Sequence, residues 1–364
     1  MELNNAIQTE SFAPAPRYEK QPKWAKLKRK INSIIIGRIN GTPLQFSLYR
    51  SYWHYRLGPK TNEVQDATIA NTHYLTQVPN YGAGIGHQLA NWNAGLYFAD
   101  FYKIKFAHSP FSTAQWENFL GFGEGEVLAS DLENDKKFTK VRLPRFDSLN
   151  LAQVALIGKI ISSYKQPGVL FSLEMDQGYM RQWSTYHVLS DKFFSAAARK
   201  NDKLIYDPDK FNIAIHIRRR MKIETDEVWK ERGLDNSYYA NILTETLALI
   251  RDKQQVEVYL FSQGRIEDFP EFASFDNMHY CMDMGPVETV LHMVNADLLI
   301  SSKSSFSYKP ALISKSIQIC PQTFWHNYPT ATNYILADNN GVFDKSKLLN
   351  QLSLTSKLKQ LSQI

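Results

Sequence analysis

The sequence has little cysteine and no long apolar run. Only two cysteines occur among its 364 residues, Cys281 and Cys320. Each falls at or near the end of a predicted buried strand, which favours small core side chains over a disulfide or a metal pair. No stretch of 18 or more apolar residues is present, so no transmembrane helix is expected. The N-terminus lacks a charged and then apolar leader pattern, and we therefore expect a cytoplasmic protein.

Motifs that bind metal ions are also missing. The sequence contains no HExxH motif and no Cys/His cluster with ligand spacing. Asp207-Pro208-Asp209 has the DxD form, but the proline and the position just before a predicted strand indicate a turn. We expect no metal and no other cofactor.

Positive charge is concentrated at one end of the chain. Residues 1–60 contain 11 Lys or Arg and 3 Asp or Glu, a net charge of +8, whereas the whole chain carries +6. Residues 61–364 therefore carry −2, and this near-neutral body argues against a nucleic-acid-binding protein.

The basic segment 23–40 has the pattern of an amphipathic helix. Trp24, Leu27 and Ile31 recur at helical spacing, and lysines lie among and opposite them. Such a helix suits an anionic membrane surface, although a helix that packs on the protein with a solvated basic side would show the same pattern. We expect a peripheral contact with the inner face of a membrane as one use of this segment.

Strands and helices alternate through most of the chain, which predicts an α/β protein with parallel sheets. Two α/β units, each with a Gly-rich or Ser-rich turn after a strand, suggest two domains that face each other across a cleft. The predicted division is an N-terminal arm, an N-terminal domain, a C-terminal Rossmann-like domain and a C-terminal helix, at residues 1–60, 61–205, 206–345 and 346–364. In the C-terminal domain the predicted strands are 213–217, 256–261, 278–282, 297–300 and 316–320.

The run Ile213-Ala-Ile-His-Ile-Arg-Arg-Arg220 is the clearest functional signal. Its β-branched residues predict a buried strand, and the strand stops at three consecutive arginines. Guanidinium groups cannot stay buried without anionic partners. Because ligands of open α/β sheets bind at the carboxyl ends of the strands, this edge predicts an anion-binding site.

Two further turns offer groups suited to phosphate. The loop Asn80–Gly86 precedes a predicted helix, and its glycines would let the backbone approach a ligand closely. The loop Ser301–Ser307 offers hydroxyls, amides and one ammonium between a strand and a helix. The first pattern also fits an ordinary tight turn, and the second fits a Ser-rich helix cap.

Polar residues at other strand ends point to the same edge. Ser262 and Gln263 follow one predicted strand and Asp283 follows the next, where they could read a purine edge or simply form turns. Past the arginines, Glu224, Asp226 and Glu227 form an acidic segment. A carboxylate there could accept a proton from an acceptor hydroxyl, or the segment could be a solvated loop.

Taken together, these motifs resemble the fucosyltransferase superfamily. His216-Ile-Arg-Arg219 is similar to its HxRR signature, and Gly84-Ile-Gly-His-Gln88 to its GxGNQ loop. Asp235–Ala240 resembles the start of its next helix, and Glu288–Ser307 resembles its serine-containing segment. The superfamily includes bacterial α-1,2- and α-1,6-fucosyltransferases and protein O-fucosyltransferases. The four motifs occur in the same order and span residues 82–314.

The resemblance implies a GT-B-like fold of two Rossmann-like domains and a metal-independent, inverting transfer from GDP-fucose. Arg218 would hold the β-phosphate and assist departure of GDP, and Asp226 matches the position of a proposed base. The implied site consists of His216, Arg218 and Asp226 as catalytic residues and Gly84, Gly86, His87, Gln88, Arg219, Ser262, Gln263, Asp283, Ser304, Ser305, Phe306 and Ser307 as donor-binding residues.

This chain departs from the family pattern at three places, one of which is Tyr308-Lys309, where the α-1,2 enzymes have tryptophans. His87 stands where GxGNQ has asparagine, and Arg220-Met221 follows HIRR where the family usually has Gly-Asp or Thr-Asp. The predicted function is transfer of fucose from GDP-fucose to a hydroxyl of a glycan acceptor, a surface polysaccharide or glycolipid. A transferase for another GDP-sugar, or a non-catalytic module that binds nucleotide sugars or glycans, is the alternative.

Overall fold

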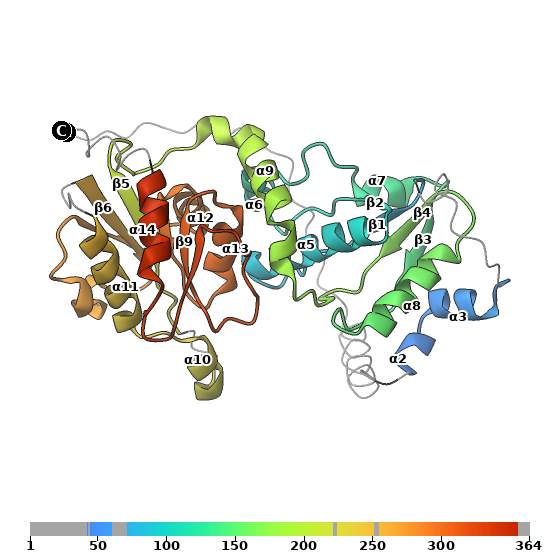
Figure 1. The fold of residues 1–364 in the computed structure, drawn as a ribbon. Helices are drawn as coiled ribbons and strands as arrows, with labels where there is room; N and C mark the ends of the chain where they lie inside the picture. The colour runs from blue at the N-terminus through green and yellow to red at the C-terminus, as the bar shows by residue number, and fades with distance from the viewer. Residues whose placement is uncertain (1–41, 43, 60–70, 221–223, 251–254, 356–364) are drawn as a thin grey trace.

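The computed structural model describes residues 42, 44–59, 71–220, 224–250 and 255–355. The predicted membrane-binding segment 23–40 lies outside this part of the chain. The described residues form an α/β protein with two parallel sheets in two domains that lie side by side (Figure 1). The two-domain, GT-B-like class predicted from the sequence is confirmed.

The C-terminal domain contains a six-stranded parallel sheet in the order β10-β9-β8-β5-β6-β7. Read from β7, this is the doubly wound strand order 3-2-1-4-5-6, in which the direction of winding reverses between the first and fourth strands. In this protein the reversal lies between β5 and β8. The strands are β5 (Phe211–His216), β6 (Val256–Ser262), β7 (Met278–Met282), β8 (Leu298–Ile300), β9 (Ile317–Pro321) and β10 (Tyr334–Ala337).

Strand β5 lies inside this sheet, between β8 and β6. All six of its residues are buried as a result. It pairs in parallel with β6 on one side, where His216 is opposite Phe261, and with β8 on the other, where Ile215 is opposite Ile300. A strand buried on both faces favours a continuous apolar sequence over an alternating one. The helices of this domain are α10 (Asp226–Arg232), α11 (Asn236–Leu249), α12 (Pro286–Asn295), α13 (Ser305–Ile313) and α14 (Lys345–Leu354), with 3-10 turns at Ile266–Asp268 and Pro270–Phe272.

The N-terminal domain has a smaller parallel sheet in the order β2-β1-β4-β3. Two of its strands, β3 and β4, were not predicted, since each has only four residues and Val141 is the one buried residue of β3. The elements are β1 (Tyr74–Thr76), α5 (Ile85–Phe101), β2 (Lys105–Phe106), α6 (Ala114–Leu120), α7 (Ala129–Asn134), β3 (Thr139–Arg142), α8 (Leu151–Ser162), β4 (Val169–Ser172), a 3-10 turn at Gln182–Thr185, α9 (Tyr186–Ser195) and a 3-10 turn at Ala197–Asn201.

The end of the predicted N-terminal arm packs on this domain. It forms α2 (Leu44–Ser47) and α3 (Arg50–Leu57), and α3 lies against α8 and β3. Ser51 Oγ donates to the Arg142 carbonyl at 2.7 Å, and the His54 ring stacks on Tyr164 with a centroid distance of 4.0 Å. These contacts join residues 44–57 to the N-terminal domain.

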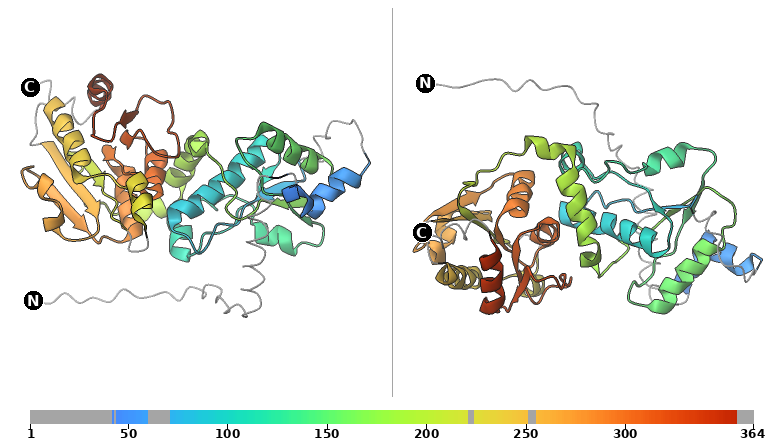
Figure 2. Two further views of the ribbon diagram at one scale, coloured as in Figure 1. Left: turned by 90° about the horizontal axis from the view of Figure 1, so that it is seen from below. Right: turned by 45° about the horizontal axis from the view of Figure 1, so that its top comes forward.

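The two domains share one continuous apolar core. It runs from α5, with Leu89 and Trp92, to α12 and α13, with Met293 and Tyr308. Helices α5, α9 and α13 lie between the two sheets in each view (Figure 2). A shared core of this kind fixes the position of one domain against the other at the edge where the site lies.

A buried lysine sits inside this domain contact. Lys309 on α13 is only 2% exposed, and its Nζ donates to Gln182 Oε1 of the N-terminal domain at 2.6 Å. Burial lowers the pKa of Lys309 to about 7. The ammonium form is therefore disfavoured in the folded protein.

We expect stability to depend on pH through Lys309. Between pH 7 and the ordinary lysine pKa of 10.5, the unfolded chain binds the proton that the folded chain lacks, so the free energy of unfolding rises with pH. The slope is at most about 1.4 kcal/mol per pH unit. Chemical denaturation of the wild type and of Lys309→Met across this range measures it. The free energy of unfolding of the wild type minus that of Lys309→Met should rise with pH across this range, and a constant value of this difference would contradict the assignment.

Candidate functional site

The site lies where the winding of the C-terminal sheet reverses. The carboxyl ends of β5 and β8 are neighbours there, and they continue into the arginine run and the serine loop. His216 at the end of β5 is joined to Ser302 after β8 by a hydrogen bond of 2.9 Å between Nδ1 and Oγ. This crevice is the usual ligand site of doubly wound sheets.

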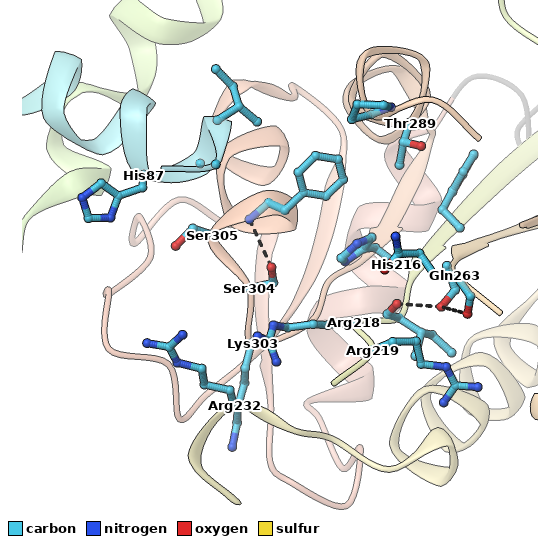
Figure 3. Close-up of a pocket in the computed structure, with 18 of the residues that line it drawn as sticks. His87, His216, Arg218, Arg219, Arg232, Gln263, Thr289, Lys303, Ser304 and Ser305 are labelled. Atoms are coloured by element: carbon cyan, nitrogen blue, oxygen red, sulfur yellow. Dashed lines mark hydrogen bonds between the residues drawn. The ribbon is translucent and has the colours of Figure 1, made fainter. Parts of the chain in front are cut away.

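A cavity of about 560 Å³ opens at this edge between the two domains. Its walls include the first residues of three helices: α5 from the N-terminal domain, and α12 and α13 from the C-terminal domain (Figure 3). Helix N-termini carry partial positive charge and unpaired amides, so their convergence favours an anionic ligand. Gly86 lets α5 approach α13, because a Cβ there would lie 2.8 Å from the backbone of Ser305.

Four cationic side chains line the cavity: Arg218, Arg219, Arg232 and Lys303. None of the described residues that line it is Asp or Glu. The other walls include aromatic and aliphatic side chains such as Phe261, Phe306 and Trp325. A cavity with this lining fits a ligand that combines phosphate groups with rings.

Arg218 is held in place by Glu224. One guanidinium nitrogen, Nη2, donates to Glu224 Oε1, and the two side chains are 12% and 5% exposed. The other terminal nitrogen, Nη1, is buried without a hydrogen-bond partner among the described residues. A buried donor without a partner is unfavourable unless a ligand supplies an acceptor. The Arg218 side chain also borders the cavity, so its positive charge lies next to any ligand bound there.

The other two arginines of the run diverge. Arg219 donates through Nη2 to the Asp268 carbonyl at 2.9 Å and lies over the Phe269 ring, and it still borders the cavity. Arg220 does not border the cavity. Its Nη2 lies 2.6 Å from Asp226 Oδ1, and both side chains are well exposed.

His216 is a neutral group at the base of the cavity. Burial, with a smaller effect of the Arg218 charge, lowers the pKa of His216 to about 4. Burial also lowers the pKa of Lys303. Neutral His216 fixes the serine loop through Ser302 and adds no charge next to Arg218.

Most of the residues predicted from the sequence meet in this cavity, although they come from both domains. Their convergence follows from parallel strands ending at one edge and from α5 pointing its first turn at that edge. They are Gly84, Gly86, His87, His216, Arg218, Arg219, Ser262, Gln263, Ser304, Ser305 and Phe306.

Two predicted donor-binding residues support the loops instead of lining the cavity. Gln88 is buried and donates to the Ala83 carbonyl at 2.8 Å and to Ser112 Oγ at 2.9 Å, which fixes the glycine loop. Ser307 is buried and its Oγ accepts from the Ser302 amide at 3.1 Å, which fixes the serine loop.

Asp283 and Asp226 also lie outside the lining. Asp283 has a left-handed backbone with φ of 57°, and its amide donates to the Ser262 carbonyl at the end of β6. Asp226 begins α10 and is 76% exposed in its ion pair with Arg220. The acidic segment was expected to be a loop or a source of the base, and its described part forms the start of a helix.

Several lining residues were not predicted. Arg232 ends α10, and its guanidinium carbon lies 4.5 Å from the centroid of the Trp325 ring. These two residues come from segments that carry no motif. Met284, Pro286 and Thr289 also line the cavity, and the Gly285-Pro286 start of α12 was the available signal for them.

The sequence predicts that the protein has no metal site, no disulfide and no transmembrane helix. No group of three or more His, Cys, Asp or Glu suited to a metal ion occurs among the residues that the structure describes. Cys281 and Cys320 are both free. None of the helices in the described ranges has the length and apolarity needed to cross a bilayer.

Comparison with known proteins finds solved structures that resemble this one at low sequence identity. No family model and no curated protein matches the sequence. The structure of POFUT1 in complex with GDP-fucose is 12% identical, with 70% of this chain and 97% of that chain covered and a TM-score of 0.39. The E. coli heptosyltransferase WaaC with ADP-2-deoxy-2-fluoro heptose is 12% identical, with 80% and 99% covered and a TM-score of 0.36. Values this low do not determine a reaction, so the chemistry is inferred from the residues of this chain.

Gly86 and Gly84 provide a matched test of how the site is assembled. We expect Gly86→Ala to push α5 away from α13, because its new Cβ would meet the Ser305 backbone, whereas Gly84→Ala meets no atom within 4 Å. Gly86→Ala should lower the Tm and weaken nucleotide binding, and Gly84→Ala should leave the Tm close to that of the wild type. Differential scanning fluorimetry measures both, and equal Tm values for the two variants would contradict the close contact.

Proposed function

We propose that the protein is an inverting glycosyltransferase that moves fucose from GDP-fucose to a hydroxyl of a glycan acceptor. The observation that carries the proposal is the cavity at the β5–β8 edge, with four cations and no lining carboxylate among the described residues. The HxRR-like and GxGNQ-like motifs, which meet in this cavity, support the choice of donor. POFUT1, a structural neighbour of low identity, has been solved with GDP-fucose.

The diphosphate would occupy the cationic part of the cavity. Arg218 offers its guanidinium to the β-phosphate, and Lys303 and the helix amides at Ser304 and Ser305 surround the same space. These groups stabilise the negative charge that develops on GDP as the sugar–phosphate bond breaks. In this proposal they do the work for which other transferases use a divalent cation, and no metal or other cofactor is required.

The remaining lining residues would bind the nucleoside and the sugar. Ser262 and Gln263 after β6 present a hydroxyl and an amide, and Met284 and Phe261 offer apolar surface. In this arrangement the N-terminal residues Gly84 to His87 face the sugar and the acceptor. Another GDP-sugar would fit the same diphosphate site, so the sugar is the least constrained part of the proposal.

A non-catalytic module that binds nucleotide sugars is the second candidate. It is favoured by the absence of Asp and Glu among the described lining residues, since these side chains are common bases in glycosyl transfer. Consumption of GDP-fucose by the purified protein would exclude this candidate, and binding without consumption would support it.

The same arginine-to-lysine substitution can be made at Arg218, which lines the cavity, and at Arg220, which does not and therefore serves as the control. Arg218→Lys keeps a cation against Glu224 but loses the planar fork, so turnover should fall by roughly 10²-fold or more and GDP should bind more weakly. Arg220→Lys should keep nearly full turnover, because Arg220 does not border the cavity. GDP release from GDP-fucose and calorimetric titration with GDP measure the two effects. Equal behaviour of the variants would contradict the proposed role of Arg218.

The membrane contact is a separate proposal. Residues 23–40 are basic and periodically apolar, and the described chain continues with the exposed side chains Leu44, Leu48 and Leu57. We propose that this end of the protein binds anionic lipid at the cytoplasmic face of a membrane that carries a glycolipid or polysaccharide acceptor.

Vesicle sedimentation tests this contact. The full chain should co-sediment with vesicles that contain phosphatidylglycerol and not with pure phosphatidylcholine, and removal of residues 1–40 should abolish the binding. Equal sedimentation with and without these residues would refute the proposed contact, and circular dichroism of the shortened chain checks that it is folded.

A further inference from the structure

A histidine–aspartate pair lies on the N-terminal wall of the cavity. His87 is in the first turn of α5 and borders the cavity (Figure 3), and Asp176 is in the loop that follows β4. The distance between His87 Nε2 and Asp176 Oδ1 is 2.8 Å. The two side chains are 51% and 35% exposed, so solvent and a second substrate can reach them.

The surroundings of Asp176 determine which ring nitrogen carries the proton. Asn80 Nδ2 donates to both carboxylate oxygens, at 3.3 and 3.1 Å, and an ionised carboxylate can only accept. His87 must therefore donate through Nε2–H, which leaves the lone pair of neutral imidazole on Nδ1. Asp176 has a left-handed backbone with φ of 60°, a conformation that aspartate adopts more readily than most residues.

The carboxylates near the arginine run are poorly placed to accept a proton from an acceptor. Glu224 is 5% exposed and bound to Arg218, and Asp226 is paired with Arg220 outside the cavity. His216 borders the cavity, but it is buried beside Arg218 with its Nδ1 bonded to Ser302. Among the described lining residues, His87 is the one imidazole with a carboxylate partner and an accessible ring.

We propose that His87 is the general base that deprotonates the acceptor hydroxyl and that Asp176 positions its ring. The inference rests on the proposed glycosyl transfer. Nδ1 of His87 takes the hydroxyl proton, and the acceptor oxygen forms the new bond to the anomeric carbon. The bond from that carbon to the β-phosphate oxygen breaks, and its electron pair leaves with GDP, which the cationic side of the cavity stabilises. Asp176 stabilises the imidazolium that results.

The protonation state of His87 can be observed without any substrate. Long-range ¹H–¹⁵N spectra of the protein labelled at its nine histidines report the tautomer of each ring, and His87→Asn identifies the His87 signals. We expect the Nε2–H tautomer at pH 7.5, and a mixture of tautomers in Asp176→Asn. An imidazolium or an Nδ1–H tautomer in the wild type would overturn the proposal, because neither could accept a proton at Nδ1.

Kinetics test the role itself. The probes are GDP-fucose in water and GDP-fucose with p-nitrophenyl β-galactoside, so water or a sugar hydroxyl serves as the acceptor. His87→Gln, which removes the base without recreating the asparagine of the GxGNQ loop, should lower the rate of GDP-fucose consumption by about 10²- to 10⁴-fold. The dissociation constant for GDP should change by no more than about twofold, because His87 acts on the acceptor and not on the diphosphate.

Three kinetic outcomes would overturn the proposal. They are a wild-type rate in His87→Gln, an equal loss of GDP affinity and rate in that variant, or a loss of rate in Asp226→Asn in place of His87→Gln. Failure of the proposed function would look different, because the wild type itself would then neither bind GDP nor consume GDP-fucose. The tautomer measurement needs no substrate, so in that case it would still report which nitrogen of His87 carries the proton.

Discussion

The ion pair between Arg218 and Glu224 organises the site. Glu224 is nearly buried and binds Arg218 directly, while Arg232 Nη1 lies 3.7 Å from the same carboxylate oxygen and Arg220 donates to the Glu224 carbonyl at 3.0 Å. One carboxylate therefore anchors guanidinium groups from β5 and α10. Since a single negative charge cannot neutralise two lining arginines and Lys303, the cavity retains a positive charge that suits a diphosphate.

The topology of the sheet explains why this charge faces a ligand. Strand β5 is buried along its length, and the winding reverses beside it, so the arginines leave the core at the crevice between the ends of β5 and β8. The start of α5 closes the cavity from the other domain, and the Gly86–Ser305 contact sets how closely it approaches. One wall therefore carries the arginines and Lys303, and the wall from the N-terminal domain carries the His87–Asp176 pair.

The sequence was most informative where residues of known chemistry follow a buried strand. The Arg218 and Ser304 loops could be placed together because parallel strands end at one edge. Arg232, Trp325 and Asp176 could not be found in this way, since they come from a short helix and from loops whose course depends on tertiary packing. Asp226 was expected in the cavity from its distance along the chain, but α10 begins there and directs it to solvent, where Arg220 neutralises it.

The central claim is that the β5–β8 edge binds the diphosphate of a nucleotide sugar. A crystal structure of the protein with GDP tests it most directly. The account predicts β-phosphate oxygens within hydrogen-bonding distance of the Arg218 guanidinium and of the amides at the start of α13, with guanine toward Ser262 and Gln263. GDP bound at another place, or bound here with its phosphates away from Arg218, would contradict the account.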